Sequence, residues 1–186
     1  HWHTESRQEW PTMVAAVQDV EGKICAIHRT YLTNNGSGKA PVPEKTGKKS
    51  LGRVGGGSVR LSLAADTVAL VEGIEDALVV QQMTQTPTWA VMGTSGFGTV
   101  ALPKHIRRVI LAPDGDQAGD KAIDPAARRL IRAGIEVVVV RLPPGKDWCD
   151  ILPIFEERAA LLEFEGGRDH KDANRQAWFE TLGKQP

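Results

Sequence analysis

The stretch TVALVEGIEDAL, residues 67–78, decides the fold. Residues 67–71 are mostly apolar and rich in β-forming side chains, so they predict a short buried strand. Glu72 and Gly73 follow at once, and residues 74–83 have the apolar spacing of a helix. A strand, a tight turn and a helix in this order form the unit from which parallel sheets are built.

The same alternation continues toward the C-terminus. Short apolar runs that suit buried strands are separated by longer stretches with helical spacing. Strands that alternate with helices of this length predict an α/β fold, with a parallel sheet of about four strands flanked by helices. The expected elements are a strand over 88–92, a glycine-rich loop over 93–98, a short helix near 102–105, a strand over 108–112, a helix over 118–133, a strand over 135–141 and a helix over 148–162.

The first third of the chain has a different pattern. Residues 12–32 contain two apolar runs around a turn and predict a β-hairpin, and a polar loop follows over 34–57 with a short strand near Leu51. Residues 59–63 alternate between apolar and polar side chains, as a strand does. We therefore expect a small, mostly β, basic subdomain over 1–65, a main α/β domain over 66–163 and a helical extension over 164–186. The extension either docks on the main domain or leads to a partner, and the sequence leaves both open.

The charge of the chain is balanced overall but unevenly distributed. Its 23 Lys and Arg residues match its 23 Asp and Glu residues. Residues 1–60 hold nine of the basic and five of the acidic residues, which leaves 14 against 18 for the rest. A basic segment suits a polyanion such as DNA, whereas an acidic segment suits a bound cation.

The cysteine content and the hydropathy exclude several classes of protein. Cys25 and Cys149 are the only cysteines, too few for a disulfide framework or a four-cysteine zinc ribbon. The longest apolar run lies within 136–141 and is far shorter than the roughly 18 residues that a membrane span requires. No signal-peptide pattern opens the sequence, so we expect a cytoplasmic protein.

Several carboxylates follow the expected strands directly. In an open parallel sheet, ligands bind beyond the carboxyl ends of the strands, so these acids should gather at one edge. Carboxylates that lie together repel one another unless a cation neutralises them. Mg²⁺, or Mn²⁺, is the simplest occupant because it prefers oxygen ligands and keeps waters that a phosphate can replace. The candidate metal ligands are Glu72, Asp114, Asp116, Asp147 and Asp150.

Simpler interpretations account for some neighbouring residues. An EF-hand loop that begins at Asp114 fails because Ala118 and Pro125 would stand at two of its ligand positions. Glu75 lies in the first turn of the expected helix, where an acid complements the helix dipole, and we favour that role for it. The stretch NGSGKA, residues 35–40, lacks the first glycine and the Ser or Thr of a P-loop, so we interpret it as a basic turn.

Four separated motifs carry a resemblance to a known family. They are EGIEDAL (72–78), MGT (92–94), APDGDQAGDKA (112–122) and GKDWCDIL (145–152). In this order and spacing they resemble the Toprim domain that bacterial-type primases, topoisomerases and some nucleases share, and the resemblance spans residues 66–155. The segments VEGKICAIHRTYL (20–32) and SLGRVGGGSVRL (50–61) are similar to the region that precedes Toprim in phage- and plasmid-type primases.

The resemblance implies a Rossmann-like Toprim catalytic domain over 66–163. In it, Glu72 acts at the reacting phosphate, Asp114 and Asp116 bind metal, and Asp147 with Asp150 completes the acidic cluster. The implied activity is that of a primase catalytic core, a Mg²⁺-dependent nucleotidyltransferase that makes short RNA primers on single-stranded DNA. The implied partners are a single-stranded DNA template, nucleoside triphosphates, and a replicative helicase or helicase and zinc-binding modules that this sequence does not contain.

The basic front segment would then hold the template strand or a nucleoside triphosphate over the acidic edge. The glycine-rich loop would let a phosphate approach backbone N–H groups near the metal. The candidate residues for binding nucleic acid or nucleotide are Arg29, Lys39, Lys48, Lys49, Arg53, Arg60, Gly93 and Thr94.

Two other functions stay open. A Toprim-type nuclease would use the same metal ligands with water as the nucleophile, whereas a DNA-cleaving topoisomerase is disfavoured because the single tyrosine, Tyr31, lies in the expected hairpin. A receiver-like regulatory domain, which is not an enzyme, also gathers acids around Mg²⁺ at strand ends. It requires a lysine directly after a late strand, where this sequence has Arg141 and a Pro-Pro-Gly turn that leads to Lys146.

Overall fold

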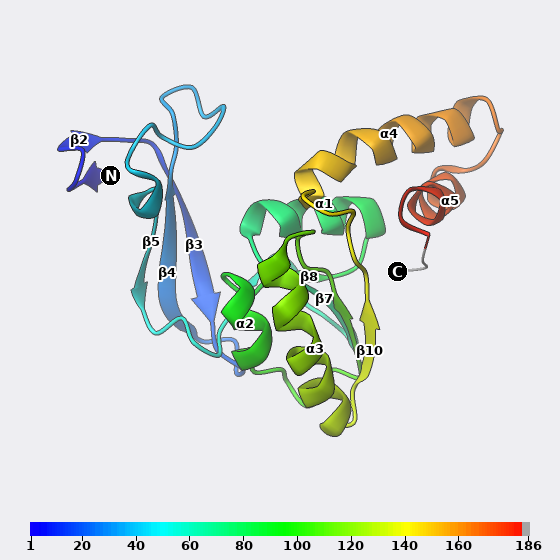
Figure 1. The fold of residues 1–186 in the computed structure, drawn as a ribbon, viewed down its shortest axis with the longest axis horizontal. Helices are drawn as coiled ribbons and strands as arrows, with labels where there is room; N and C mark the ends of the chain where they lie inside the picture. Colours follow the sequence, from blue (N-terminus) through cyan, green and yellow to red (C-terminus); the bar gives the residue numbers. More distant parts are fainter. Residues whose placement is uncertain (184–186) are drawn as a thin grey trace.

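The computed structural model describes residues 1–183, except for the side chain of Glu44, and has a five-stranded sheet at its centre (Figure 1). The strand order is β10-β9-β7-β8-β6. The four strands β7 (Thr67–Val71), β8 (Thr88–Ala90), β9 (Arg108–Leu111) and β10 (Glu136–Val139) run parallel. The short β6 (Val59–Arg60) pairs with β8 in the antiparallel direction and forms one edge. The predicted α/β fold with a four-stranded parallel sheet is confirmed.

Helices cover both faces of this sheet, and the side chains of each strand alternate between the two. Ala69 and Val71 belong to one apolar cluster, with α1 (Ile74–Thr84), α4 (Trp148–Phe164) and α5 (His170–Leu182). Val68 and Leu70 belong to the other cluster, with α2 (Thr94–Thr99) and α3 (Gln117–Arg132). β7 lies between β8 and β9, and it is buried on both faces because helices cover both sides of the sheet.

The first third of the chain forms a second, three-stranded antiparallel sheet with the order β3-β4-β5. Its strands are β3 (Thr12–Gln18), β4 (Ile24–Tyr31) and β5 (Lys48–Gly52). A small hairpin of β1 (Trp2–His3) and β2 (Gln8–Glu9) precedes it, and a 3-10 turn, η1 (Glu44–Thr46), leads into β5. The predicted β-rich front is confirmed, whereas the division of the chain at residue 65 stays a prediction, since β6 from that range joins the central sheet.

The second sheet packs against the central domain through a shared core. Val17 and Ala26 lie in the same apolar cluster as α1 and α4. Gln18 forms a bridge with Ser58, directly before β6. One face of the β3-β4-β5 sheet therefore lies against the start of α1 (Figure 1). The side chains on this face of the sheet lie beside the carboxyl ends of the central strands.

The position of the second helix differs from the expectation. We predicted a glycine-rich loop over 93–98 and a short helix near 102–105, but α2 occupies Thr94–Thr99 and no helix lies over 102–105. A side chain at position 96 would prevent this arrangement, because its Cβ atom would lie 1.9 Å from the carbonyl oxygen of Val91. Glycine has no Cβ atom and therefore permits it. Gly96 thus serves close packing of the helix against the end of β8, a role that its low helix propensity conceals.

The C-terminal extension docks on the domain. Trp178 of α5 is 1% exposed and stacks on Trp148 of α4, with ring centroids 5.8 Å apart and planes 12° apart. Of the expected extension over 164–186, residues 184–186 lie outside the described part. Within residues 1–183, no helix is both long and apolar enough to cross a membrane.

Candidate functional site

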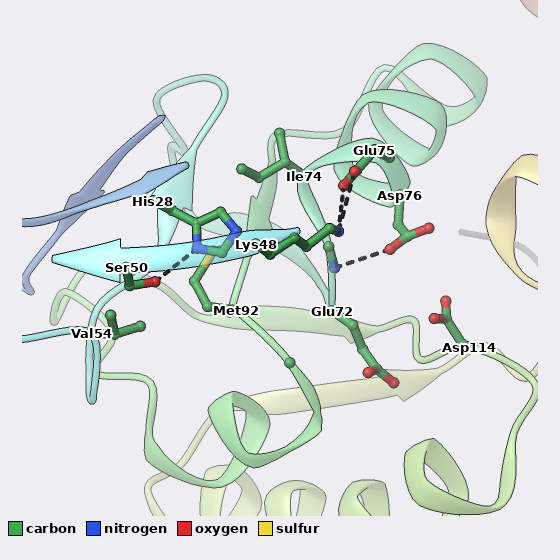
Figure 2. A pocket seen from close by; sticks show the side chains of 12 residues that line it. His28, Lys48, Ser50, Val54, Glu72, Ile74, Glu75, Asp76, Met92 and Asp114 are labelled. Atoms are coloured by element: carbon green, nitrogen blue, oxygen red, sulfur yellow. Dashed lines mark hydrogen bonds and ion pairs between the residues drawn. The ribbon is translucent and has the colours of Figure 1, made fainter. Parts of the chain in front are cut away.

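A cavity of about 320 Å³ lies where the ends of the parallel strands meet the second sheet (Figure 2). Glu72 follows β7, Met92 and Gly93 follow β8, and Asp114 follows β9 after an alanine and a proline. The opposite wall comes from β4 and β5, which supply His28, Lys48 and Ser50. The cavity therefore lies at the carboxyl edge of the sheet, where the strand-end rule predicts a ligand.

Glu72 and Asp114 form an acidic pair, and neither makes an ion pair with a described residue. One carboxylate oxygen of each, Oε1 of Glu72 and Oδ1 of Asp114, is buried and has no hydrogen-bond partner. Burial, followed by the charges of Asp114 and Asp116, raises the pKa of Glu72 to about 7. Burial and the charges of Asp76 and Asp147 raise the pKa of Asp114 to about 6. A buried carboxylate that lacks a partner is costly, so this pair calls for a cation.

The pair fits a divalent cation, although it does not by itself enclose one. No group of three or more His, Cys, Asp and Glu side chains within residues 1–183 could hold a metal ion. Mg²⁺ at sites of phosphate chemistry commonly takes only one or two protein carboxylates and completes its shell with water and substrate oxygens. Gly119 lets the start of α3 come close to the pair, since a Cβ atom there would lie 2.7 Å from the carbonyl oxygen of Asp114 and 3.2 Å from Glu72 Oε1.

The other three predicted ligands are engaged in helix capping. Asp116 caps α3 and accepts a hydrogen bond from the backbone N–H of Gly119 at 2.7 Å. Asp147 caps α4 and accepts from the N–H of Asp150 at 2.9 Å, while Asp150 accepts in return from the N–H of Asp147 at 3.4 Å. Asp116 and Asp147 still raise the pKa values of the Glu72–Asp114 pair, but the five acids do not form a single ligand set.

Glu75 and Asp76 also line the cavity. From the sequence we favoured a helix-dipole role for Glu75, and we did not name Asp76 as a site residue. Asp76 is 9% exposed, and its Oδ2 accepts a hydrogen bond from the N–H of Gly73 at 3.0 Å. Its charge is the largest electrostatic contribution, after burial, to the raised pKa of Asp114. The signal was available, because Asp76 lies in the first turn of the helix that follows β7 and so stays near the carboxyl end of that strand.

Lys48 is the cation that faces the acidic end. Its Nζ lies 3.2 Å from Glu75 and joins β5 of the second sheet to the first turn of α1 (Figure 2). Both side chains are more than a third exposed, so the pair is weak and can be exchanged for another anion.

The other predicted basic residues lie elsewhere. Lys49 pairs with Glu5 at 2.5 Å on the opposite face of β5, beside Arg29, its cross-strand neighbour. Arg60 lies over the ring of Trp89, 4.2 Å from its centroid, and donates to the carbonyl of Asp19. Lys39 lines a separate cavity that also includes Lys48. None of Arg29, Lys39, Lys49, Arg53 and Arg60 lines the cavity at the strand ends.

The loop after β8 shapes the floor of the cavity. Met92 and Gly93 both have positive φ angles, 65° and 101°, the first of which is uncommon for a side chain with a Cβ atom. The N–H of Gly93 donates to the carbonyl of Glu72 at 3.0 Å and so is not available to a phosphate. This bond fixes the backbone of Glu72 beside the cavity. Gly93 lines the cavity and Thr94 does not, and binding by either stays a prediction.

Comparison with known proteins agrees with this architecture. Residues 67–153 match the sequence profile of the Toprim domain, and residues 1–61 match a domain of unknown function (DUF7146). The chain is 26% identical over 138 residues to the DNA primase of Clostridium acetobutylicum, covering 73% of this chain and 23% of that protein. It is 36% identical over 101 residues to the DNA primase of Aquifex aeolicus, covering 52% of this chain and 20% of that protein. The chain thus spans about a fifth to a quarter of these relatives.

A solved structure shows the same fold over nearly the whole chain. The crystal structure of the Aquifex aeolicus primase, with its zinc-binding and RNA polymerase domains, superposes with a TM-score of 0.56 at 19% identity. The match covers 91% of this chain and 46% of that one. Residues 67–153 are therefore a Toprim domain, the class that the parallel sheet and its acidic edge define. Within that class, the domain is primase-like and homologous to bacterial-type DNA primases.

Proposed function

We propose that this chain is the catalytic core of a primase, which joins ribonucleotides on single-stranded DNA in the presence of Mg²⁺. The observation that carries the proposal is the Glu72–Asp114 pair. These two half-buried carboxylates have raised pKa values and no ion-pair partner among the described residues, and they share one cavity with Lys48. Nucleotidyl transfer depends mainly on positioning and on charge stabilisation around phosphates, and this arrangement offers both.

Each residue has a separate task in this mechanism. Glu72 and Asp114 would hold the divalent cation, which would supply charge neutralisation at the α-phosphate and would lower the pKa of the attacking 3′-hydroxyl. Lys48 exchanges Glu75 for a phosphate oxygen and so orients the triphosphate. Asp116 and Asp147 remain at their helix N-termini and add negative potential that favours the cation. Pyrophosphate leaves as the product.

The relatives support the proposal by their chemistry. The two curated relatives are DNA primases, and the similar Aquifex structure contains an RNA polymerase domain. We extend the same classes of ligand to this chain, namely single-stranded DNA and nucleoside triphosphates. A helicase, or helicase and zinc-binding modules, would complete the machinery.

A nuclease would use the same acidic pair with water as its nucleophile, so an activity assay is needed to separate the two enzymes. A receiver-like role has less support. Arg141, which stands where a receiver needs a lysine near the acids, pairs instead with Asp120 and Asp124 of α3 and does not line the cavity.

The test incubates the chain with single-stranded DNA, labelled ribonucleotides and Mg²⁺, and in parallel with supercoiled plasmid and Mg²⁺. We expect RNA products longer than one nucleotide, their loss in Glu72→Gln, and their retention in Glu157→Gln, which changes an exposed glutamate on α4. Nicked plasmid without RNA products would instead identify the nuclease. Undiminished primer synthesis by folded Glu72→Gln would refute the role of the acidic pair.

A further inference from the structure

The cavity has two chemically different ends (Figure 2). Glu72, Asp76 and Asp114 gather at one end. At the other end lie His28 and Ser50, with the apolar side chains of Val54 and Met92 beside them, and no acid is labelled there. The acidic end suits a metal-bound triphosphate. The other end suits an uncharged part of a ligand, because its apolar side chains offer nothing to a phosphate.

His28 presents one free ring nitrogen in a fixed orientation. It is 9% exposed, and its Nδ1 forms a hydrogen bond of 2.8 Å with the hydroxyl of Ser50, directly opposite on the neighbouring strand. The structure records no partner for Nε2 within residues 1–183. Burial and the nearby charge of Lys48 lower the pKa of His28, whereas Glu75 opposes this. These effects favour the neutral imidazole, in which Nε2 donates or accepts according to the direction of the Ser50 bond.

We infer that the His28–Ser50 pair binds a hydroxyl of the ribose of the incoming nucleotide and distinguishes ribonucleotides from deoxyribonucleotides. The inference rests on the proposed function and adds to it a group that selects the sugar. Nε2 of His28 makes the contact, and Ser50 acts as a positioning residue that fixes the imidazole ring and its tautomer. A hydroxyl matches either tautomer of the imidazole because it both donates and accepts.

The sugar is a better occupant than the base for two reasons. The described residues that line this end include no Phe, Tyr or Trp on which a base could stack, and the ring of His28 is only 9% exposed. In addition, a template-directed enzyme must accept all four bases, since pairing with the template selects among them, whereas the ribose hydroxyls are common to all four substrates. A fixed hydrogen-bonding group beside the sugar therefore adds selectivity without interfering with templating.

The experiment measures binding by calorimetry to the full chain with Mg²⁺ and four probes: ATP, 2′-deoxyATP, 3′-deoxyATP and inorganic tripolyphosphate. The variants are His28→Ala, Ser50→Ala and Ser50→Thr. His170→Ala serves as a matched control, because His170 lies on α5 and bonds to Glu163 and Asn174 away from the cavity. Ser50 is an exposed residue of β5, so we expect the Ser50 variants to fold. They therefore still test the inference if His28→Ala does not fold.

We expect wild type to bind ATP about five- to tenfold more tightly than at least one of the two deoxy analogues. A difference of this size corresponds to the loss of about one hydrogen bond. His28→Ala and Ser50→Ala should remove that preference and leave the affinity for tripolyphosphate unchanged. Ser50→Thr and His170→Ala should keep the preference. In primer synthesis, the same two alanine variants should incorporate deoxyribonucleotides about as well as ribonucleotides.

The inference is overturned if folded His28→Ala and Ser50→Ala retain the wild-type ratio of ATP to deoxyATP affinities. It is also overturned if they weaken ATP, both deoxy analogues and tripolyphosphate equally, because that result would assign the pair a purely structural role. These outcomes leave the proposed function intact as long as Asp114→Asn still abolishes RNA synthesis. Absence of ATP binding to wild type would overturn both.

Discussion

Replacing Asp114 by Asn should make the metal-free protein more stable at alkaline pH while removing its response to Mg²⁺. The pKa of Asp114 is raised from 3.8 to about 6, mainly by burial. A carboxyl group whose pKa is raised on folding contributes its full stability below the unfolded value, and that contribution is lost as the pH rises through the folded value. Without a cation, the free energy of unfolding should therefore fall between about pH 4 and about pH 7.

The magnitude can be worked out from the shift. A rise of roughly two pKa units corresponds to about 3 kcal/mol at high pH, because each unit is worth about 1.4 kcal/mol. Asp114 is only partly buried and its neighbours can relax, so we expect Asp114→Asn to gain about 1–2 kcal/mol near pH 8 and nothing near pH 4. Glu72 acts in the same direction, since its pKa of about 7 reflects burial and the charge of Asp114.

Urea unfolding in the presence of a chelator, at pH values from about 4 to about 8, measures these differences. A parallel series with saturating Mg²⁺ should stabilise wild type by about 2–3 kcal/mol near pH 8 and leave Asp114→Asn almost unchanged. Glu157→Gln, on the exposed side of α4, controls for the general loss of one negative charge. The reasoning would be refuted if Asp114→Asn were less stable than wild type near pH 8, or if both responded equally to Mg²⁺.

Three further predictions concern the packing and the wall of the cavity. Gly96→Ala should lower the free energy of unfolding in urea by at least about 2 kcal/mol, because the new Cβ atom would overlap a backbone oxygen. Gly98→Ala on the same short helix is the control: a Cβ atom there would meet no atom within 4 Å, so the change should be neutral or stabilising. Trp178→Ala should cost about 3–5 kcal/mol in the same assay if α5 is part of the fold, and an unchanged midpoint would show that α5 does not depend on this contact. Lys48→Met should change stability by less than about 1 kcal/mol, since its ion pair is exposed, yet weaken tripolyphosphate binding by about tenfold in calorimetry. Equal tripolyphosphate affinity in wild type and Lys48→Met would remove Lys48 from the phosphate site.

The parallel sheet was predictable because burial on both faces leaves a local signature. The apolar run over 67–71 is continuous, and the structure shows why, since alternate residues of β7 enter two different cores. The helix over 94–99 was not predictable, because four of its six residues have low helix propensity: two glycines and two β-branched threonines. That helix exists because Gly96 lets the backbone approach the end of β8, which is a tertiary cause.

The acidic pair was predictable for a similar reason. Glu72 and Asp114 each come after a buried strand, and the carboxyl ends of neighbouring parallel strands lie at the same edge of the sheet. Metal binding by Asp147 and Asp150 stays a prediction. The pattern Asp147-x-x-Asp150 is also the signature of a capping box, and the structure shows that box. His28 and Ser50 had no signal in sequence, since their pairing depends on the register between β4 and β5.

The cavity depends on two segments that match different family profiles. Glu72, Asp76 and Asp114 lie within the Toprim range, whereas Lys48 and His28 lie within the range of unknown function. The charged side chains that the Toprim range supplies to this cavity are all carboxylates, an arrangement that attracts a cation but repels a triphosphate. The second sheet contributes the ammonium group of Lys48 and a neutral surface around His28. Because Val17 and Ala26 share the core of α1, the sheet is held against the acids by packing, so both walls of the cavity are set by the fold before any ligand arrives.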